Sequence, residues 1–150
     1  MKAGKLRFFM NFWPPFLGSG IKLEQLSDDY RHALVSLSAR WYNRNYVGTH
    51  FGGSLFSMTD PFYMLMYMQN LGRDYLVWDQ EASIRFVSPG RGRVTARFEL
   101  TDQHLQAATT ATANGEKYLA EHIVSVLNAD NEVVAEVSKI IYIRRKARAR

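Results

Sequence analysis

A carboxylate followed directly by proline, Asp60-Pro61, interrupts the most apolar stretch of the chain, Leu55 to Met68. The spacing of the apolar residues predicts a helix here, with Gly72 as its C-cap. A helix needs about 20 apolar residues to span a bilayer, and this run is too short and too interrupted, so we expect no transmembrane segment. A buried carboxylate is costly unless it is paired, protonated or used in chemistry. Asp60 is therefore the residue that most needs an explanation.

Proline at position 61 removes one intrahelical hydrogen bond, opposite the carbonyl of Ser57, and predicts a kink in the helix. The freed carbonyl and the Ser57 side chain, one turn from Asp60, would hold a water molecule or orient the carboxylate. In the alternative interpretation Asp60 is structural and accepts a hydrogen bond from Ser57, from Tyr63 or from a partner subunit. A carboxylate on an apolar helix face is a candidate for function, and we treat Asp60 as one.

Extended segments surround this helix. The stretch from Tyr30 alternates between apolar and polar residues, as a half-buried strand does, and four more extended segments follow the helix, at 75–87, 93–100, 117–127 and 133–143. Each is joined to the next by a short turn or loop. One strand, one central helix and an antiparallel meander make an α+β layout in which a curved sheet wraps the helix. Alternating βα units with a glycine-rich loop are missing, which disfavours a dinucleotide-binding fold.

An additional helix is expected at the N-terminus, where Phe8, Phe9, Phe12, Trp13 and Phe16 recur at helical spacing. The Pro14-Pro15 pair ends it, and the following "LEQLSDDY" can add another helical turn. We favour a helix that packs over the core or against a dimer partner, with binding to a membrane surface as the weaker alternative. The chain is then one domain, with an N-terminal helical segment (1–29), a core (30–145) and a basic tail (146–150).

Composition limits the partners and the compartment. The formal charge is +5, but "RRKARAR" at the C-terminus supplies much of it, so a nucleic-acid partner is not implied. The chain has no cysteine, which excludes disulfides and thiolate chemistry and makes a cytoplasmic location the default. No metal site is expected, because the four histidines lie in separate elements without ligand spacing.

The stretch from Asn45 to Asp60 resembles the hotdog-fold acyl-CoA thioesterases of the phenylacetate-degradation (PaaI-like) type. That family carries a loop reading approximately N-x-x-G-x-x-H-G-G, followed by an acidic residue nine positions after the histidine. The pattern falls here on Asn45, Gly48, Phe51 in place of the histidine, Gly52-Gly53 and Asp60. The resemblance spans about residues 30 to 145. It implies a thioesterase whose smallest active unit is a dimer, and a homodimer or a dimer of dimers is expected.

The residues themselves suggest how such chemistry would work. If Gly52 and Gly53 begin the helix, their backbone N–H groups are free to hold a thioester carbonyl as it becomes an oxyanion. Asp60 would act as a general base on water or as a nucleophile, and the sequence does not choose between them. Eight helical residues separate Gly52 from Asp60, a rise of roughly 12 Å. The two groups would therefore reach one thioester only from different protomers, at a two-fold interface.

Several other residues are candidates for the site. Asn45 would orient water or the thioester oxygen, or is simply a turn residue. We place Gly53, His50, Phe51 and Ser57 near the substrate. The resemblance implies that Arg91 and Arg93 meet the phosphates of coenzyme A, which is part of the substrate and not a separate cofactor. Solvated strand-edge positions explain the two arginines equally well. The same explanation serves Lys139, although it shares its register with the apolar Val137 and Ile141.

The sequence thus predicts an enzyme that hydrolyses an acyl-CoA or acyl-carrier thioester at a dimer interface. The alternative is a non-catalytic acyl-CoA or fatty-acyl binding module on the same scaffold, because Phe51 replaces the histidine. A hotdog hydratase or dehydratase is third, since those relatives pair a histidine with the acid and Asp60 has no evident histidine partner. A nucleic-acid binder is last, because aromatic and basic residues are not interleaved on one strand face.

Overall fold

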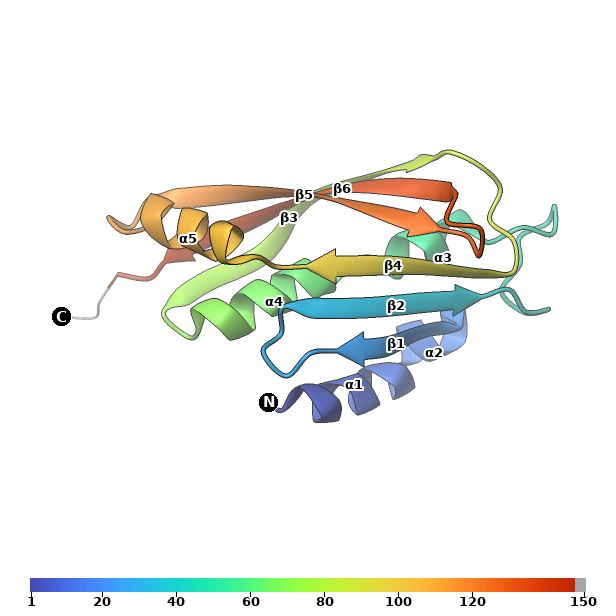
Figure 1. Ribbon diagram of the computed structural model, residues 1–150, viewed down its shortest axis with the longest axis horizontal. Coiled ribbons are helices and arrows are strands. Elements are labelled where there is room, and N and C mark those ends of the chain that lie inside the picture. The colour runs from blue at the N-terminus through green and yellow to red at the C-terminus, as the bar shows by residue number, and fades with distance from the viewer. Residues whose placement is uncertain (148–150) are drawn as a thin grey trace.

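The computed structural model describes residues 1–147 and is built around one antiparallel sheet (Figure 1). The strands are β1 (Ile21–Leu26), β2 (His32–Ser38), β3 (Tyr75–Phe86), β4 (Arg93–Glu99), β5 (Lys117–Leu127) and β6 (Val133–Arg145). Their order in the sheet is β1-β2-β4-β5-β6-β3. The helices are α1 (Ala3–Phe12), α2 (Pro14–Ser19), α3 (Gly52–Ser57), α4 (Phe62–Leu71) and α5 (Asp102–Ala111). The predicted α+β class is confirmed.

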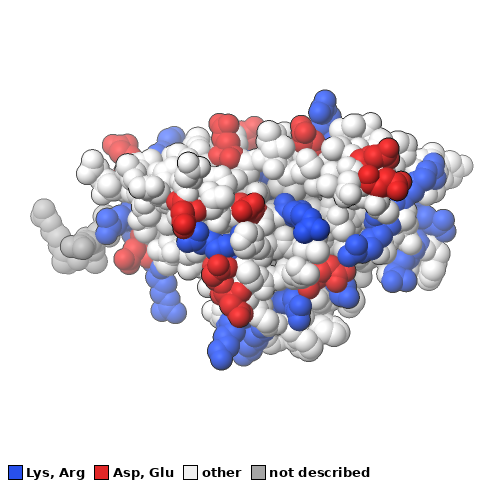
Figure 2. Space-filling view, in the orientation of Figure 1, with Lys and Arg blue, Asp and Glu red and all other residues white. Residues whose placement is uncertain are grey.

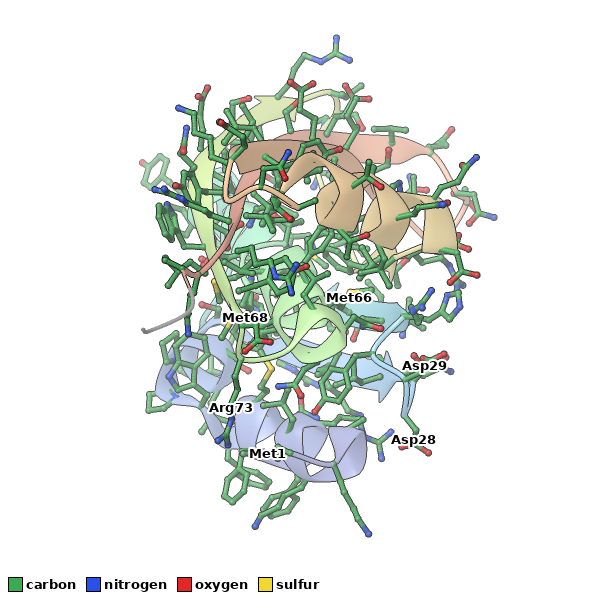
Figure 3. The ribbon with its side chains drawn as sticks, turned by 90° about the vertical axis from the view of Figure 1, so that its left-hand side faces the viewer. Met1, Asp28, Asp29, Met66, Met68 and Arg73 are labelled. Atoms are coloured by element: carbon green, nitrogen blue, oxygen red, sulfur yellow. The ribbon has the colours of Figure 1, made fainter. Side chains whose placement is uncertain are left out.

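Alternation of side chains gives the sheet one apolar face, against which α4 packs. In β4 the side chains of Val94, Ala96 and Phe98 are buried, while the residues between them face outward. The ring of Phe62 on α4 lies 4.9 Å from that of Phe98. In Figure 3 the curved sheet passes over α4, which carries Met66 and Met68, and α1 lies below it. No helix within residues 1–147 is long and apolar enough to cross a membrane.

Three elements differ from the sequence predictions. The stretch expected to add a helical turn forms β1, because Ile21 and Leu23 alternate with polar residues and are buried against the core. The stretch after β4, expected to be a short loop, contains α5, whose N-cap Thr101 and third residue His104 form a reciprocal capping box. The strands do not form a simple meander, because β3 pairs with β6 at the edge of the sheet and not with β4.

The predicted central helix is two helices. Proline has no backbone N–H, so helical hydrogen bonding stops before Pro61, which instead serves as the N-cap of α4. The amide of Asp60 bonds to the carbonyl of Ser57, as in a tight turn. The Ser57 hydroxyl donates to the carbonyl of Gly53 at 2.8 Å. The expected kink is thus a complete break, and Ser57 bonds along α3 and not to Asp60.

The two edge strands of the sheet, β1 and β3, differ in whether a side chain covers their backbone groups. On β1 the side-chain amide of Asn11 accepts from the Leu23 N–H at 2.8 Å and donates to the Leu23 carbonyl at 3.2 Å. An edge strand offers unpaired backbone groups to other chains, and Asn11 occupies some of those of β1. At the other end of the sheet, β3 pairs only with β6 among the described residues. The fold therefore leaves β3 as its open edge.

A buried histidine lies on the inner face of β5. The imidazole of His122 stacks on Tyr63 at a ring distance of 3.8 Å, and its Nε2 lies 3.0 Å from the Tyr67 hydroxyl. Burial, together with nearby His104, lowers the pKa of His122 to about 4. The imidazole is therefore neutral in the folded protein at neutral pH.

We predict that His122 makes the fold sensitive to acid. Because its folded pKa of about 4 is below its ordinary value of 6.5, the unfolded chain binds the proton more readily. The contribution of neutral His122 to the free energy of unfolding is fully present above pH 6.5 and is lost as the pH falls from 6.5 towards 4. Urea unfolding should show a free energy of unfolding lower by on the order of 2 kcal/mol at the acid end. His122→Gln should flatten this slope, whereas the exposed His32→Gln should not.

Candidate functional site

The ammonium group of Lys139, on β6, lies beneath the break between α3 and α4. It donates to the carbonyl of Thr59 at 3.4 Å and to the carbonyl of Asp60. Its nitrogen lies 3.5 Å from Asp60 Oδ1 and 3.0 Å from Asp79 Oδ1. The contact with Asp79 is an ion pair whose geometry is not that of a hydrogen bond. Carbonyl groups at a helix C-terminus lack intrahelical donors, and a lysine is a suitable partner for them. Lys139 therefore stabilises the broken helix and holds two carboxylates.

Strand register explains why Asp79 and Lys139 meet. Lys139 follows the inward alternation of β6, and Asp79 stands opposite Ile141, the next inward residue along that strand. The two side chains are thus diagonal neighbours on one face. A bulge at Gln80 then shifts the alternation of β3, so that Ala82 stands opposite Lys139 and again faces inward. The bulge lets a strand that places Asp79 inside continue with apolar inward residues.

The two carboxylates differ in exposure. The Lys139 side chain is 0% exposed and that of Asp79 is 21% exposed, whereas the side chain of Asp60 is 63% exposed. Burial raises the pKa of the Asp79 carboxyl, and the Lys139 ammonium opposes that rise. The expectation of a buried, unpaired Asp60 is wrong, because Pro61 ends the helix and the turn carries the side chain to the surface. The edge position considered for Lys139 is also wrong, since β6 is an inner strand.

The predicted site residues line separate hollows. One hollow, of about 570 Å³, is lined by Asn45, His50, Gly52 and Arg91 together with Phe86 and Leu55. A second, of about 400 Å³, is lined by Gly53, Ser57 and Asp60 together with Trp13, Phe16 and Phe56. A third, of about 330 Å³, contains Phe51 and also touches Gly53 and Ser57. Within one chain, Gly52 and Asp60 therefore open into different hollows.

The loop before α3 is held by Asn45. Its Oδ1 accepts from the N–H groups of Val47 and Thr49, and its Nδ2 donates to the Thr49 hydroxyl at 2.8 Å. The amide thus shapes the loop as a turn residue does. His50 is buried at the end of this loop, with Nε2 2.8 Å from the Gly92 carbonyl and Nδ1 without a protein partner. Burial lowers the pKa of His50, which favours the neutral ring.

The two glycines of α3 are closely covered by aromatic rings. A Cβ at Gly52 would lie 2.8 Å from the ring of Phe86, and one at Gly53 would lie 2.6 Å from the ring of Phe51. A larger residue at either position would therefore have to displace the exposed ring that covers it. Phe51 is the N-cap of α3 and makes no side-chain capping bond. The first N–H groups of the helix therefore remain able to donate to another acceptor.

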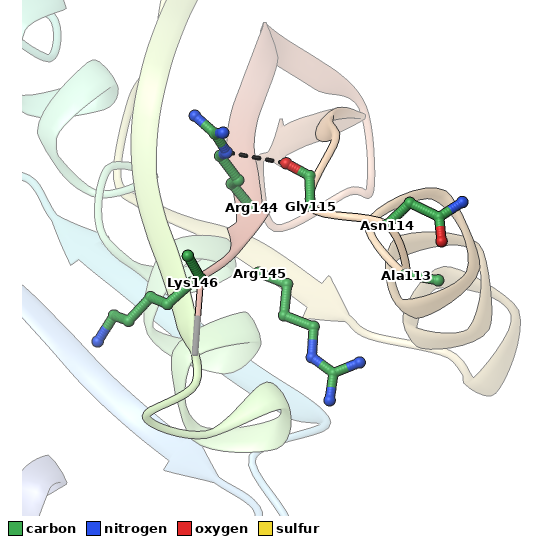
Figure 4. Close-up of a pocket in the computed structure, with 7 residues that line it drawn as sticks. Ala113, Asn114, Gly115, Arg144, Arg145 and Lys146 are labelled. Carbon is green, nitrogen blue, oxygen red and sulfur yellow. Dashed lines mark hydrogen bonds between the residues drawn. The ribbon is translucent and has the colours of Figure 1, made fainter. Parts of the chain in front are cut away.

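The two predicted arginines diverge. Arg91 lines the 570 Å³ hollow, whereas Arg93 reaches Glu24 on β1 at 3.3 Å. A further hollow, of about 410 Å³, lies at the end of β6 between Arg144, Arg145 and Lys146, where Arg144 donates to the Gly115 carbonyl (Figure 4). It shares no residue with the hollows at α3. Residues 148–150 of the predicted tail lie outside the described residues.

Sequence reasoning did not identify Asp79 or connect Lys139 with Asp60. The register of Lys139 among apolar residues was the available signal, because a lysine there must find an anion in the core. Within residues 1–147, no group of three or more histidine, aspartate or glutamate side chains is arranged to hold a metal ion.

Removing the Lys139 ammonium should destabilise the fold, and more so at alkaline pH. In Lys139→Met the buried Asp79 loses its cation and the carbonyl groups at the helix break lose a donor, at a cost of about 3 kcal/mol. Acid should relieve part of this cost, because burial raises the pKa of Asp79 and a protonated carboxyl needs no counter-charge. Urea unfolding at pH 5 and pH 8 measures the difference, with the exposed Lys117→Met as control. An equal loss at both values would contradict this account.

Comparison with other proteins places the fold. A protein of unknown function from Pseudomonas aeruginosa, described as a probable thioesterase, superposes with a TM-score of 0.82 at 17% identity, covering 95% of each chain. A thioesterase from Haemophilus influenzae gives 0.67 at 11% identity, covering 97% of this chain and 92% of the other. The PaaI protein of the E. coli phenylacetic acid degradation operon gives 0.60 at 14% identity, covering 96% and 92%.

These structures confirm the predicted resemblance to the hotdog-fold, PaaI-like proteins at the level of the fold. No curated protein sequence matches this chain. Residues 3–143 match the family described as "Domain of unknown function (DUF4442)". The chain, a hotdog fold with a lysine-held aspartate at the break of its central helix, therefore belongs to the DUF4442 family.

Proposed function

We propose that this protein hydrolyses an acyl-CoA or acyl-carrier thioester, with Asp60 as the reacting carboxylate. The observation that carries the proposal is the environment of Asp60. Its carboxylate sits in a turn between two helices, is 63% exposed and is held from below by a fully buried ammonium group. It opens into a hollow lined mainly by apolar side chains, suited to an acyl chain. The fold, shared with proteins named as thioesterases, adds support.

In the proposed reaction a water oxygen attacks the thioester carbonyl carbon while Asp60 accepts the proton. The carbonyl oxygen becomes an oxyanion, held by the backbone N–H of Gly52. The carbon–sulfur bond then breaks as the carbonyl re-forms, giving the carboxylic acid, and the leaving thiolate takes the proton that Asp60 had accepted from water. Direct attack by the Asp60 carboxylate, followed by hydrolysis of the anhydride, is the second form of the same proposal. Coenzyme A enters as part of the substrate, with Arg91 available for its phosphates.

Two copies are needed to complete this site. Gly52 and Asp60 open into different hollows of one chain. The N–H group that holds the oxyanion next to Asp60 is therefore best supplied by Gly52 of a second copy. The open edge of β3 supports such an assembly, because its unpaired backbone groups can bond to the same strand of another chain. Either a homodimer or a dimer of dimers would satisfy this requirement. A cytoplasmic location remains the expectation from the lack of cysteine.

Lys139 acts in this proposal as a positioning residue. It touches neither hollow, yet it fixes the backbone carbonyl of Asp60 and lies 3.5 Å from the carboxylate. Through these contacts it fixes the turn that presents the Asp60 carboxylate to the hollow. Asp79 is paired with the same ammonium group. If the Asp79 carboxyl were protonated, Asp60 would be the one carboxylate among the described residues still paired with Lys139.

Asp60→Asn should lower thioester hydrolysis by about 10²-fold or more, the scale expected for a positioned base. Thiol release from short, long and aryl acyl-CoAs measures this, and binding of the same acyl-CoAs should be retained. The matched control is Asp102→Asn, which changes an exposed carboxylate on α5. Saturable binding without turnover in the wild type would instead support the acyl-binding module, which the exposed Phe51 in the histidine position favours. Equal turnover in both proteins would exclude Asp60 from the chemistry.

Mixing two inactive variants should restore activity if the site is shared between copies. Gly52→Val places side-chain atoms against the Phe86 ring and should disable the oxyanion donor, while Asp60→Asn disables the base. Half of the dimers in an equal mixture are mixed, and each has one intact site of two, so about a quarter of the wild-type rate should return. Activity is measured after unfolding and refolding the mixture together. A site contained in one chain would give no recovery.

A further inference from the structure

The N-terminal helices carry an exposed aromatic surface that the proposed chemistry does not use. Helix α1 buries Ala3 and Met10 against the molecule. On its solvent side Phe8 is 60% exposed and Phe12 is 62% exposed, with their rings 4.9 Å apart. The surface consists of Phe8, Phe9, Phe12, Trp13 and Leu17, all exposed, and we call it the aromatic patch. Contiguous exposed apolar surface of this kind marks an interaction site.

The segment of sequence that carries the aromatic patch has charges of one sign. Residues 1–23 contain Lys2, Lys5, Arg7 and Lys22 and no acidic residue. The Lys5 ammonium lies 5.8 Å from the centre of the Phe9 ring, so cation and aromatic ring share one surface. Figure 2 shows Lys and Arg side chains at the lower edge of the molecule, where α1 lies in Figure 1, with acidic side chains directly above them.

The nearest acidic groups belong to other segments, and none of them is paired with Lys2 or Lys5 among the described residues. Asp28 and Asp29 lie beside the start of α1, as Figure 3 shows, where the Tyr30 hydroxyl donates to the Met1 carbonyl. Asp29 is already bonded to the Ser27 hydroxyl at 2.6 Å. Glu24 on β1 is bonded to the Ser36 hydroxyl at 2.6 Å and is paired with Lys22 and Arg93. Arg7 donates to the Glu24 carbonyl at 3.0 Å, so Lys5, beside the Phe9 ring, and Lys2 are the cations left next to the aromatic patch.

We propose that the aromatic patch docks on the surface of an anionic lipid bilayer. Helices with Phe, Trp and Leu beside basic residues lie in the interface between headgroups and acyl chains. The aromatic rings would enter the headgroup boundary while Lys2 and Lys5 meet the lipid phosphates. A second copy of the chain fits less well, because a two-fold contact would bring the acid-free cationic segments of both copies together. An anionic bilayer offers an apolar boundary for the aromatic rings and phosphate groups for the cations.

The patch also borders the hollow that contains Asp60. Trp13 belongs to both, and Pro15 and Phe16 continue the lining towards Phe56. A bilayer-bound molecule would therefore hold this hollow next to the acyl chains of the membrane. Together with the proposed function, on which this step rests, the arrangement points to thioesters of long acyl chains that partition into membranes.

Sedimentation with vesicles tests the docking without any turnover. The full chain should bind vesicles of phosphatidylglycerol and phosphatidylcholine, and bind vesicles of phosphatidylcholine alone much less. Phe8→Ser combined with Phe12→Ser should lower binding by about ten-fold or more, because the apolar contact is lost. The exposed Ile123→Ser on β5 is the apolar control and should bind as the wild type does.

A second pair of variants separates charge from apolar contact. Lys5→Glu should weaken binding by about ten-fold or more, whereas Lys117→Glu on β5, with the same change in net charge, should leave it nearly unchanged. Equal effects of these two variants, equal binding to both kinds of vesicle, or no binding would overturn the docking. A change in oligomeric state in the Phe8 and Phe12 variant, measured by light scattering, would assign the patch to contacts between copies. Thioesterase assays in detergent-free solution report on the proposed function separately.

Discussion

One buried cation holds together the parts of this fold that differ from a plain sheet and helix. Removing an ammonium group from water costs several kcal/mol unless anions and carbonyl groups replace the water. At Lys139 the replacement comes from β3, through Asp79, and from the turn between α3 and α4, through Thr59 and Asp60. The cation on β6 thus ties the edge strand and the helix break to the same point of the core. The position of Asp60 follows from this attachment and not from a continuous helix.

The broken helix determines how the site can be assembled. Pro61 ends helical bonding, and Lys139 binds the carbonyl groups that the break exposes. The turn then presents Asp60 to one hollow, whereas the amino end of α3, at Gly52, faces another. Within a single chain, the N–H group of Gly52 and the carboxylate of Asp60 therefore do not face each other. Two-fold symmetry is the simplest arrangement that makes such halves complementary, since each copy then supplies what the other lacks.

The sequence predicted the extended segments well because alternation fixes both the strand and its inner face. The segments at 93–100 and 117–127 match β4 and β5 to within a residue. The unusual register of Lys139 was also visible in the sequence. Its partner Asp79 was not, because both faces of β3 carry apolar residues: Tyr75 and Val77 alternate with Leu76 and Trp78. Only the pairing with β6 and the bulge at Gln80 decide which set faces inward.

Other features escaped prediction for different physical reasons. The capping pair of Thr101 and His104 was a readable start for α5, but histidine replaces the usual acid or amide of a capping box. Strand β1 is short, and its inward Ile21 and Leu23 were also compatible with a helical turn. The order of strands depends on contacts between distant segments, which local periodicity does not encode.

Asn11 connects the N-terminal helix to both the assembly and the surface of the molecule. By bonding to the N–H and the carbonyl of Leu23, its side chain takes the place of a neighbouring strand at the β1 edge. The edge that keeps its backbone groups unpaired among the described residues is β3, at the opposite end of the strand order. The same bonds fix the rotation of α1, with Met10 turned inward and Phe8 and Phe12 turned outward. Arg7 adds a bond from α1 to the Glu24 carbonyl of the same strand, so the contacts that cover part of the β1 edge also hold the helix with its aromatic rings outward.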